Sequence, residues 1–286
     1  MRIREPPGRT MIAASHPWIC VTCGAHYPAG EEPPERCRIC EDARQYLGHN
    51  GQHWTTPAEM RECHRNAIAE IEPGLTGIVT EPGFAIGQQA HLIQTPAGNL
   101  LWSCVAHLDD ATVEEVERRG GLAGITVSHP HFFTGMAAWS DAFGGVPIHV
   151  HADDQAWVTH PSDAIRPWSG ESLEVLPGLT LIRCGGHFPG SCVLHWAEGA
   201  GGAGVLFTGD TIMVASDRRW LSFMWSYPNL IPLPAPAVRR IAAAVEPFPF
   251  ARLYGGWSGS VVAADANAAV QRSAERYIAH LEGRGA

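Results

Sequence analysis

Two pairs of closely spaced cysteines constrain the folding of this 286-residue chain more than any other feature. Cys20 and Cys23 form the first pair, Cys37 and Cys40 form the second, and a 13-residue spacer separates them. Each pair can bring two thiolates to one ion, and four thiolates satisfy the tetrahedral geometry that zinc prefers. Residues 16–53 are poor in aliphatic side chains, so bound metal would substitute for the missing hydrophobic core. The sequence therefore predicts a small metal module at residues 16–53.

This module resembles a zinc ribbon, and its first knuckle, Cys-Val-Thr-Cys-Gly, also resembles rubredoxin. A shell of four sulfurs leaves no open coordination position, so we expect the ion to be structural. Zinc is the expected ion. Iron with a role in electron transfer is the alternative, although the rest of the chain contains no flavin or haem motif.

Composition excludes several classes of function. The sequence contains no lysine, so all 20 basic residues are arginines, and the net charge is −9. Without lysine, Schiff-base catalysis and a P-loop nucleotide site are excluded. Without a basic stripe, we expect no nucleic-acid partner. No apolar run approaches the ~18 residues of a membrane span, and the N-terminus lacks the apolar stretch of a secretory signal. We therefore expect a cytoplasmic protein with reduced thiols and no membrane partner.

The rest of the chain divides into a tail, a connecting helix and a larger domain. Residues 1–15 are expected to form a loose tail, and residues 54–75 to form the connecting helix. Thr56 and Glu59 have the spacing of a capping box at its start. The apolar residues that then recur at helical spacing are Met60, Cys63, Ala67, Ile68 and Ile71. Strand and helix patterns alternate over residues 76–286, which is typical of an α/β domain.

Four segments of this domain follow strand patterns in a recognisable order. They are His129-x-His131 after the strand GITVS, His187 in GGHFPGS, Asp210 in LFTGD and Trp257 in YGGWSG. This series resembles the metallo-β-lactamase superfamily over residues 76–262. The resemblance implies an αββα sandwich, in which two mixed β-sheets lie face to face with helices outside. It also implies a metal site at one edge of the sheets.

The family's first motif is His-x-His-x-Asp-His, and this sequence departs from it. His129 and His131 match the first two histidines, but Phe133 stands at the aspartate position and Thr134 at the last histidine. Trp257 replaces the family's closing histidine. The resemblance therefore implies that the ligands of a second metal position are lost.

The family's remaining ligands correspond to His187 and Asp210. With His129 and His131, they would hold one Zn²⁺ or Fe²⁺ ion, which could acidify water and polarise a carbonyl group. Asp210 would ligate the ion or position the attacking water, which makes it the candidate catalytic residue. We therefore expect an enzyme, a mononuclear hydrolase of a small ester, thioester, lactone or amide.

Two alternatives use the same residues. His129, His187 and Asp210 form a two-histidine, one-carboxylate set that suits non-haem iron, and in this respect the chain is similar to persulfide dioxygenases. The chain would then be an oxygenase or another redox enzyme. The second alternative is a non-catalytic descendant that binds a ligand or a partner protein.

Aromatic residues near the expected site are candidates for substrate binding. Phe133, Trp225 and Trp257 are predicted to line the pocket of a small-molecule substrate. Residues 220–227 are rich in aromatic side chains, for which core packing is the default interpretation. If they are exposed, they would form a substrate pocket or a homodimer interface.

A second His-x-His pair and two further cysteines are assigned structural roles. His149 and His151 could share one face of a strand, but the following residues have the pattern of a helix start rather than of a metal loop. Cys184 and Cys192 are expected to be small buried core residues.

Overall fold

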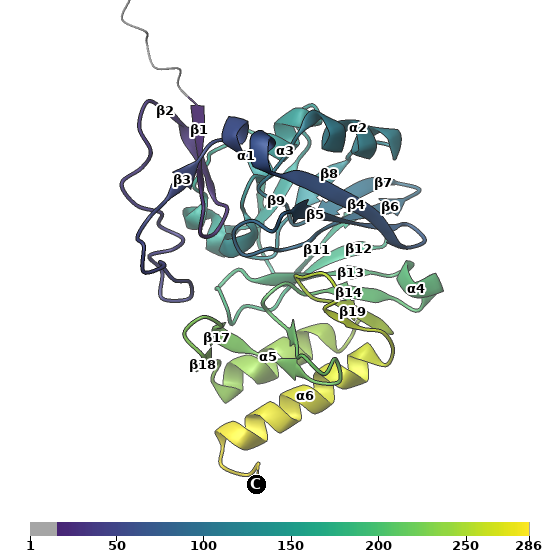
Figure 1. The fold of residues 1–286 in the computed structure, drawn as a ribbon. Helices are drawn as coiled ribbons and strands as arrows, with labels where there is room; N and C mark the ends of the chain where they lie inside the picture. The colour runs from purple at the N-terminus through teal and green to yellow at the C-terminus, as the bar shows by residue number, and fades with distance from the viewer. Residues whose placement is uncertain (1–15, 286) are drawn as a thin grey trace, which may run out of the picture.

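The computed structural model describes residues 16–285, so the predicted tail at residues 1–15 lies outside the described residues. Two β-sheets lie face to face, helices cover their outer faces, and the four-cysteine module precedes them (Figure 1). The predicted αββα sandwich of two mixed sheets is therefore confirmed. Within residues 16–285, no helix is both long enough and apolar enough to span a membrane.

The first sheet has seven strands in the spatial order β10-β9-β8-β7-β6-β5-β4. Strands β4 to β7 pair antiparallel, and β7 to β10 pair parallel. Helices α2 and α3 pack on its outer face. The bounds are β4 Arg65–Glu72, β5 Leu75–Glu81, β6 Ala90–Thr95, β7 Gly98–Trp102, α2 Asp110–Arg118, β8 Gly124–Thr126, α3 Met136–Ala142, β9 Ile148–His151 and β10 Ile165–Trp168.

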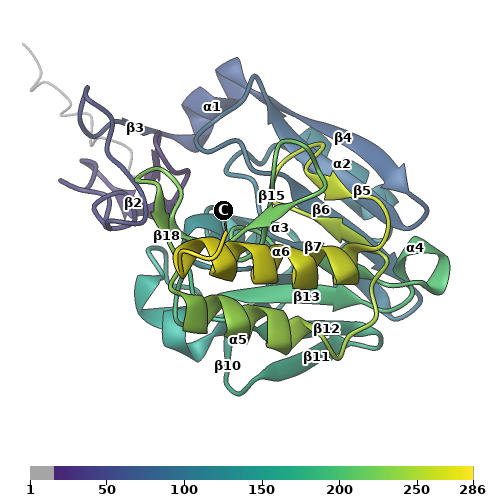
Figure 2. The ribbon, with the colours of Figure 1, turned by 90° about the horizontal axis from the view of Figure 1, so that it is seen from below.

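The second sheet has six strands in the order β11-β12-β13-β14-β19-β20, of which only β14 and β19 pair parallel. Helices α5 and α6 lie side by side on its outer face (Figure 2). The glycine-rich segment between β13 and β14 forms the short helical turn α4. The bounds are β11 Ser172–Leu176, β12 Leu179–Arg183, β13 Cys192–Trp196, α4 Gly199–Gly202, β14 Val205–Phe207, α5 Ala235–Val245, β19 Arg252–Tyr254, β20 Val261–Val262 and α6 Ala266–Leu281.

Short elements complete the fold. Strands β1, β2 and β3 form the sheet of the four-cysteine module, and two small hairpins follow β14. Their bounds are β1 His16–Cys20, β2 His26–Gly30, β3 Trp54–Thr55, β15 Met213–Val214, β16 Leu221–Ser222, β17 Met224–Ser226 and β18 Ile231–Pro232. Two 3₁₀ helices span Pro130–Phe132 and Ala152–Trp157.

The prediction of a connecting helix at residues 54–75 is wrong over most of that range. Helix α1 begins as expected, with the Thr56 hydroxyl accepting from the Glu59 amide at 3.2 Å, but it spans only Pro57–Cys63. Residues 65–72 instead form β4, the edge strand of the first sheet. The spacing of apolar residues here fits a strand as well as a helix. Pro73 and Gly74 close a hairpin to β5, with Gly74 in the left-handed region at φ +79°.

The core between the sheets holds the two layers together. Leu100 and Trp102 from the first sheet pack against Leu181, Leu194 and Phe207 from the second, and all five are almost completely buried. Burying one such side chain contributes about 1.5–3 kcal/mol. Hydrophobic packing therefore joins the two layers.

Truncation of Phe207 tests this packing. Phe207→Ala should lower the free energy of unfolding by about 3–5 kcal/mol, because it leaves a cavity between the sheets. Leu230 is 79% exposed, and Leu230→Ala is the matched control, with an expected change within about 0.5 kcal/mol. Urea unfolding followed by circular dichroism measures both. Equal midpoints for the two variants would contradict the described core.

Candidate metal centres

The four cysteines of the N-terminal module converge as predicted. Sγ of Cys20 lies 3.6 Å from Sγ of Cys40, Sγ of Cys23 lies 3.6 Å from Sγ of Cys37, and all four side chains are buried. In a tetrahedron with zinc–sulfur bonds of ~2.3 Å, the sulfur atoms are about 3.8 Å apart. The cluster therefore fits a tetrahedral thiolate metal site. Among the described residues no cysteine forms a disulfide.

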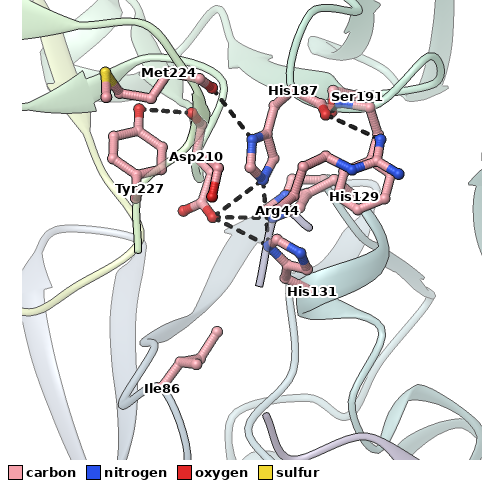
Figure 3. Close-up of polar contacts among 12 residues, drawn as sticks. Arg44, Ile86, His129, His131, His187, Ser191, Asp210, Met224 and Tyr227 are labelled. Carbon is pink, nitrogen blue, oxygen red and sulfur yellow. Dashed lines mark hydrogen bonds and ion pairs between the residues drawn. The ribbon is translucent and has the colours of Figure 1, made fainter. Parts of the chain in front are cut away.

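The second centre is built where strands of both sheets end. His129 and His131 follow β8 of the first sheet, whereas His187 follows β12 and Asp210 follows β14 of the second sheet. All four side chains are buried and point toward one another (Figure 3). The four residues predicted as ligands are therefore brought together at one edge of the sandwich.

The donor atoms lie at tetrahedral spacing. Oδ2 of Asp210 is 3.2 Å from Nε2 of His129, 3.5 Å from Nδ1 of His131 and 3.5 Å from Nε2 of His187. Nε2 of His187 is 3.2 Å from Nδ1 of His131. A tetrahedron around zinc, with bonds of ~2.0–2.1 Å, has edges of about 3.3–3.4 Å. The spacing therefore matches one first-row divalent ion.

A backbone carbonyl fixes the tautomer of one imidazole, and a hydroxyl contacts a second. Nδ1 of His187 donates to the Met224 carbonyl at 3.3 Å, so its Nε2 directs a lone pair into the site. Nδ1 of His129 is hydrogen-bonded to the Ser128 hydroxyl at 2.8 Å, which leaves Nε2 free to act as a ligand. Within the described chain, that buried Nε2 has no hydrogen-bond partner. These contacts are those expected around a metal ligand set.

The electrostatics of the centre also favour a cation. Burial lowers the pKa of His131 and of His187, so both imidazoles are neutral at neutral pH. Burial alone would raise the pKa of Asp210, but the adjacent histidines, with His129 foremost, hold it well below its ordinary value. Neutral imidazoles and an ionised carboxylate are the protonation states that bind a metal ion.

The positions of the family's second metal ligands hold side chains with structural contacts. Phe133 is buried in the core between the first sheet and its helices. The Thr134 hydroxyl donates to the Cys104 carbonyl at 3.0 Å, and the Trp257 indole N–H donates to the Ile86 carbonyl at 2.8 Å. None of these three side chains offers a ligand to a second ion.

The predicted substrate-binding residues lie in different environments. Burial of Phe133 favours a packing role, Trp257 lies edge-on to Phe132 with ring centroids 6.0 Å apart, and Trp225 is half-buried near the metal centre. Their contact with substrate stays a prediction.

Residues 220–227 are partly core and partly a support for the site. Phe223 is completely buried among residues of α5 and α6. The Tyr227 hydroxyl donates to the backbone carbonyl of Asp210 at 2.9 Å and so fixes the turn that presents this ligand. No motif in the sequence marks Tyr227 for this role.

In the second His-x-His pair, His151 makes structural contacts. His151 caps the 3₁₀ helix that follows, with Nδ1 accepting from the Asp153 amide at 3.2 Å, and its Nε2 donates to the Gly170 carbonyl at 3.3 Å. Cys184 and Cys192 are completely buried, as predicted.

Comparison with known sequences gives a full-length relative. The chain is 51% identical over 266 residues to the "Uncharacterized protein YmaE" of Bacillus subtilis (strain 168), across 92% of this chain and 96% of that protein. The chain belongs to the YmaE family. No protein-family model matches it.

Solved structures similar to this YmaE-family chain include metallo-β-lactamases. VMB-1 aligns with a TM-score of 0.58 and 11% identity, over 76% of this chain and 98% of that one. The metallo-β-lactamase FIM-1 from Pseudomonas aeruginosa, in its mono-zinc form, aligns with a TM-score of 0.56 and 16% identity, over 74% and 95%. The predicted resemblance to the metallo-β-lactamase superfamily is therefore confirmed at the level of the fold.

Removal of one histidine tests the second centre. His187→Ala should reduce bound metal from about two ions per chain to about one, because the thiolate site is untouched. His149→Ala, in a histidine outside both clusters, should leave the content unchanged. Element-resolved analysis of the purified proteins measures this. Equal metal content in His187→Ala and the unmodified chain would contradict the assignment.

Proposed function

We propose that this chain is a hydrolase that uses one divalent metal ion, held by His129, His131, His187 and Asp210. The proposed substrates are small esters, thioesters, lactones or amides. The observation that supports this most directly is the convergence of four donor atoms, 3.2–3.5 Å apart along four measured edges, at the sheet edge of a metallo-β-lactamase fold. A bound ion that expands from four ligands to five would have a position for water or for the scissile carbonyl, and would supply the Lewis acidity that activates water and polarises that carbonyl.

Asp210 is the residue best placed to handle the proton of the attacking water. Its Oδ2 faces the three imidazoles, whereas its Oδ1 is buried and has no hydrogen-bond partner in the described part of the chain. A free carboxylate oxygen beside the ligand set can accept a hydrogen bond from water and then its proton. The Tyr227 hydroxyl, which holds the Asp210 carbonyl, keeps this carboxylate in place.

A single ion is favoured over a pair. Phe133, Thr134 and Trp257 occupy the second set of ligand positions and contact the core or backbone carbonyls instead. FIM-1, which has a similar fold, is known in a mono-zinc form, and this supports the proposal of one ion.

The iron oxygenase alternative is less well supported. It requires His129, His187 and Asp210 as ligands, with His131 outside the set. Nδ1 of His131, however, lies as close to Asp210 Oδ2 as Nε2 of His187 does, at 3.5 Å. Four equivalent donors suit zinc better than a three-ligand iron site with open positions.

The thiols of the chain support a proposal for its cellular compartment. We place it in the cytoplasm, since the eight cysteines of the described chain are unpaired and two clustered pairs suit metal rather than a disulfide. The four proposed metal ligands are at most 5% exposed, which supports a small-molecule substrate. A homodimer stays a prediction.

Exchange of one carboxylate tests the proposal. Asp210→Asn should lower kcat/KM for hydrolysis by about 10²–10⁴-fold, because the amide cannot accept a proton. Asp217→Asn is the control, since Asp217 is exposed and outside the site. Hydrolysis of p-nitrophenyl acetate, a small thioester, a lactone and an amide is measured alongside metal content. Oxygen consumption by the iron-loaded protein without hydrolysis would favour the oxygenase instead. The absence of both activities would favour a non-catalytic protein.

A further inference from the structure

The four-cysteine module extends one buried side chain to the His/Asp metal centre. The Arg44 side chain is only 12% exposed, and its Nη1 donates to the backbone carbonyl of His187 at 3.3 Å (Figure 3). Its guanidinium carbon lies 3.6 Å from the ring centroid of Phe188, the next residue along. These two contacts join residues more than 140 positions apart in the sequence.

The loop that presents Arg44 is clamped on both sides. Nε and Nη2 of Arg44 donate to the two carboxylate oxygens of Asp42, at 2.6 and 2.8 Å, in a bidentate pair. From the larger domain, Nδ2 of Asn229 donates to the carbonyls of Ala43 and Gln45, at 2.8 and 3.3 Å. The loop begins two residues after the ligand Cys40, so the thiolate site anchors its start. The position of Arg44 is therefore fixed by both parts of the molecule.

The segment that Arg44 contacts begins with two glycines, and the Ser191 hydroxyl, which accepts from the Phe188 amide at 2.8 Å, holds it from within. His187 is preceded by Gly185 and Gly186, which adopt φ of +67° and +81°. Glycine adopts positive and negative φ about equally readily, so Gly185 and Gly186 do not by themselves fix the direction of His187. The hydrogen bond to the His187 carbonyl and the stacking on Phe188 hold the backbone on both sides of this ligand.

The charge of Arg44 does not explain its presence. A free guanidinium beside a divalent ion would oppose metal binding through like-charge repulsion. Asp42, which pairs with the Arg44 guanidinium through both carboxylate oxygens at 2.6 and 2.8 Å, offsets this charge. The contribution of Arg44 is therefore geometric.

We infer that Arg44 is a positioning residue of the His/Asp metal centre, supplied by the four-cysteine module, so that an intact thiolate site strengthens metal binding at the second site. This inference rests on the metal site of the proposed function but not on hydrolysis. Groups that orient a metal ligand from outside typically contribute 10–100-fold to metal affinity. By thermodynamic linkage, each occupied site strengthens the other by the same factor.

The experiment measures the Kd for Co²⁺ at the His/Asp site of the full chain, whose thiolate site is loaded with zinc. Arg44→Ala should weaken binding about 10–100-fold and shift the visible absorption of the cobalt ion. Arg44→Lys should recover part of the loss, since it keeps one donor for the His187 carbonyl. Arg36→Ala is the control, because Arg36 belongs to the same module but has a side chain that is 68% exposed.

Two further variants separate positioning from loss of fold. Asn229→Ala removes the clamp without altering Arg44, and Cys40→Ser removes one thiolate, so both should weaken Co²⁺ binding in the same direction. An unchanged Kd and spectrum in Arg44→Ala, with the zinc retained, would overturn the positioning role. An unchanged Kd in Cys40→Ser would overturn the coupling. Weakened Co²⁺ binding in a chain that hydrolyses no substrate would leave this inference intact and reject the proposed hydrolase.

Discussion

The buried carboxylate of Asp210 sets the conditions for the whole site. An ionised group removed from water costs several kcal/mol unless it is compensated, and the adjacent histidines provide this compensation for Asp210. A shared divalent ion would add to this compensation and would satisfy the inward lone pairs of the three histidines. The surrounding contacts serve that arrangement: Ser128 and Met224 orient imidazoles, and Tyr227 holds the turn of Asp210.

The two parts of the chain obtain their stability in different ways. The larger domain buries apolar side chains in three layers, between its sheets and beneath its helices. The N-terminal module has a small core in which the four cysteines are prominent, so a bound metal ion would replace hydrophobic area there. Arg44 and Asn229 form hydrogen bonds between the two parts, so the small module is joined to the larger domain near the His/Asp centre.

Much of the fold and all of the proposed metal ligands could be predicted from the sequence, because local patterns encode them. The Cys-x-x-Cys pairs and the histidines at strand ends are short-range signals, and their order identified the sandwich. Strand β4 was mispredicted because its apolar spacing fits two periodicities, and only pairing with β5 decides between them. Arg44 could not be found, since its contact with His187 depends on how two distant segments pack.

The origin of the four ligands has a mechanical consequence. His129 and His131 follow β8 in one layer, and the other two ligands follow β12 and β14 in the facing layer. An ion held by all four would join the two layers at this edge of the sandwich, in addition to the hydrophobic packing between them. Such a site cannot exist before the layers have met, so metal capture reports that the tertiary structure is complete.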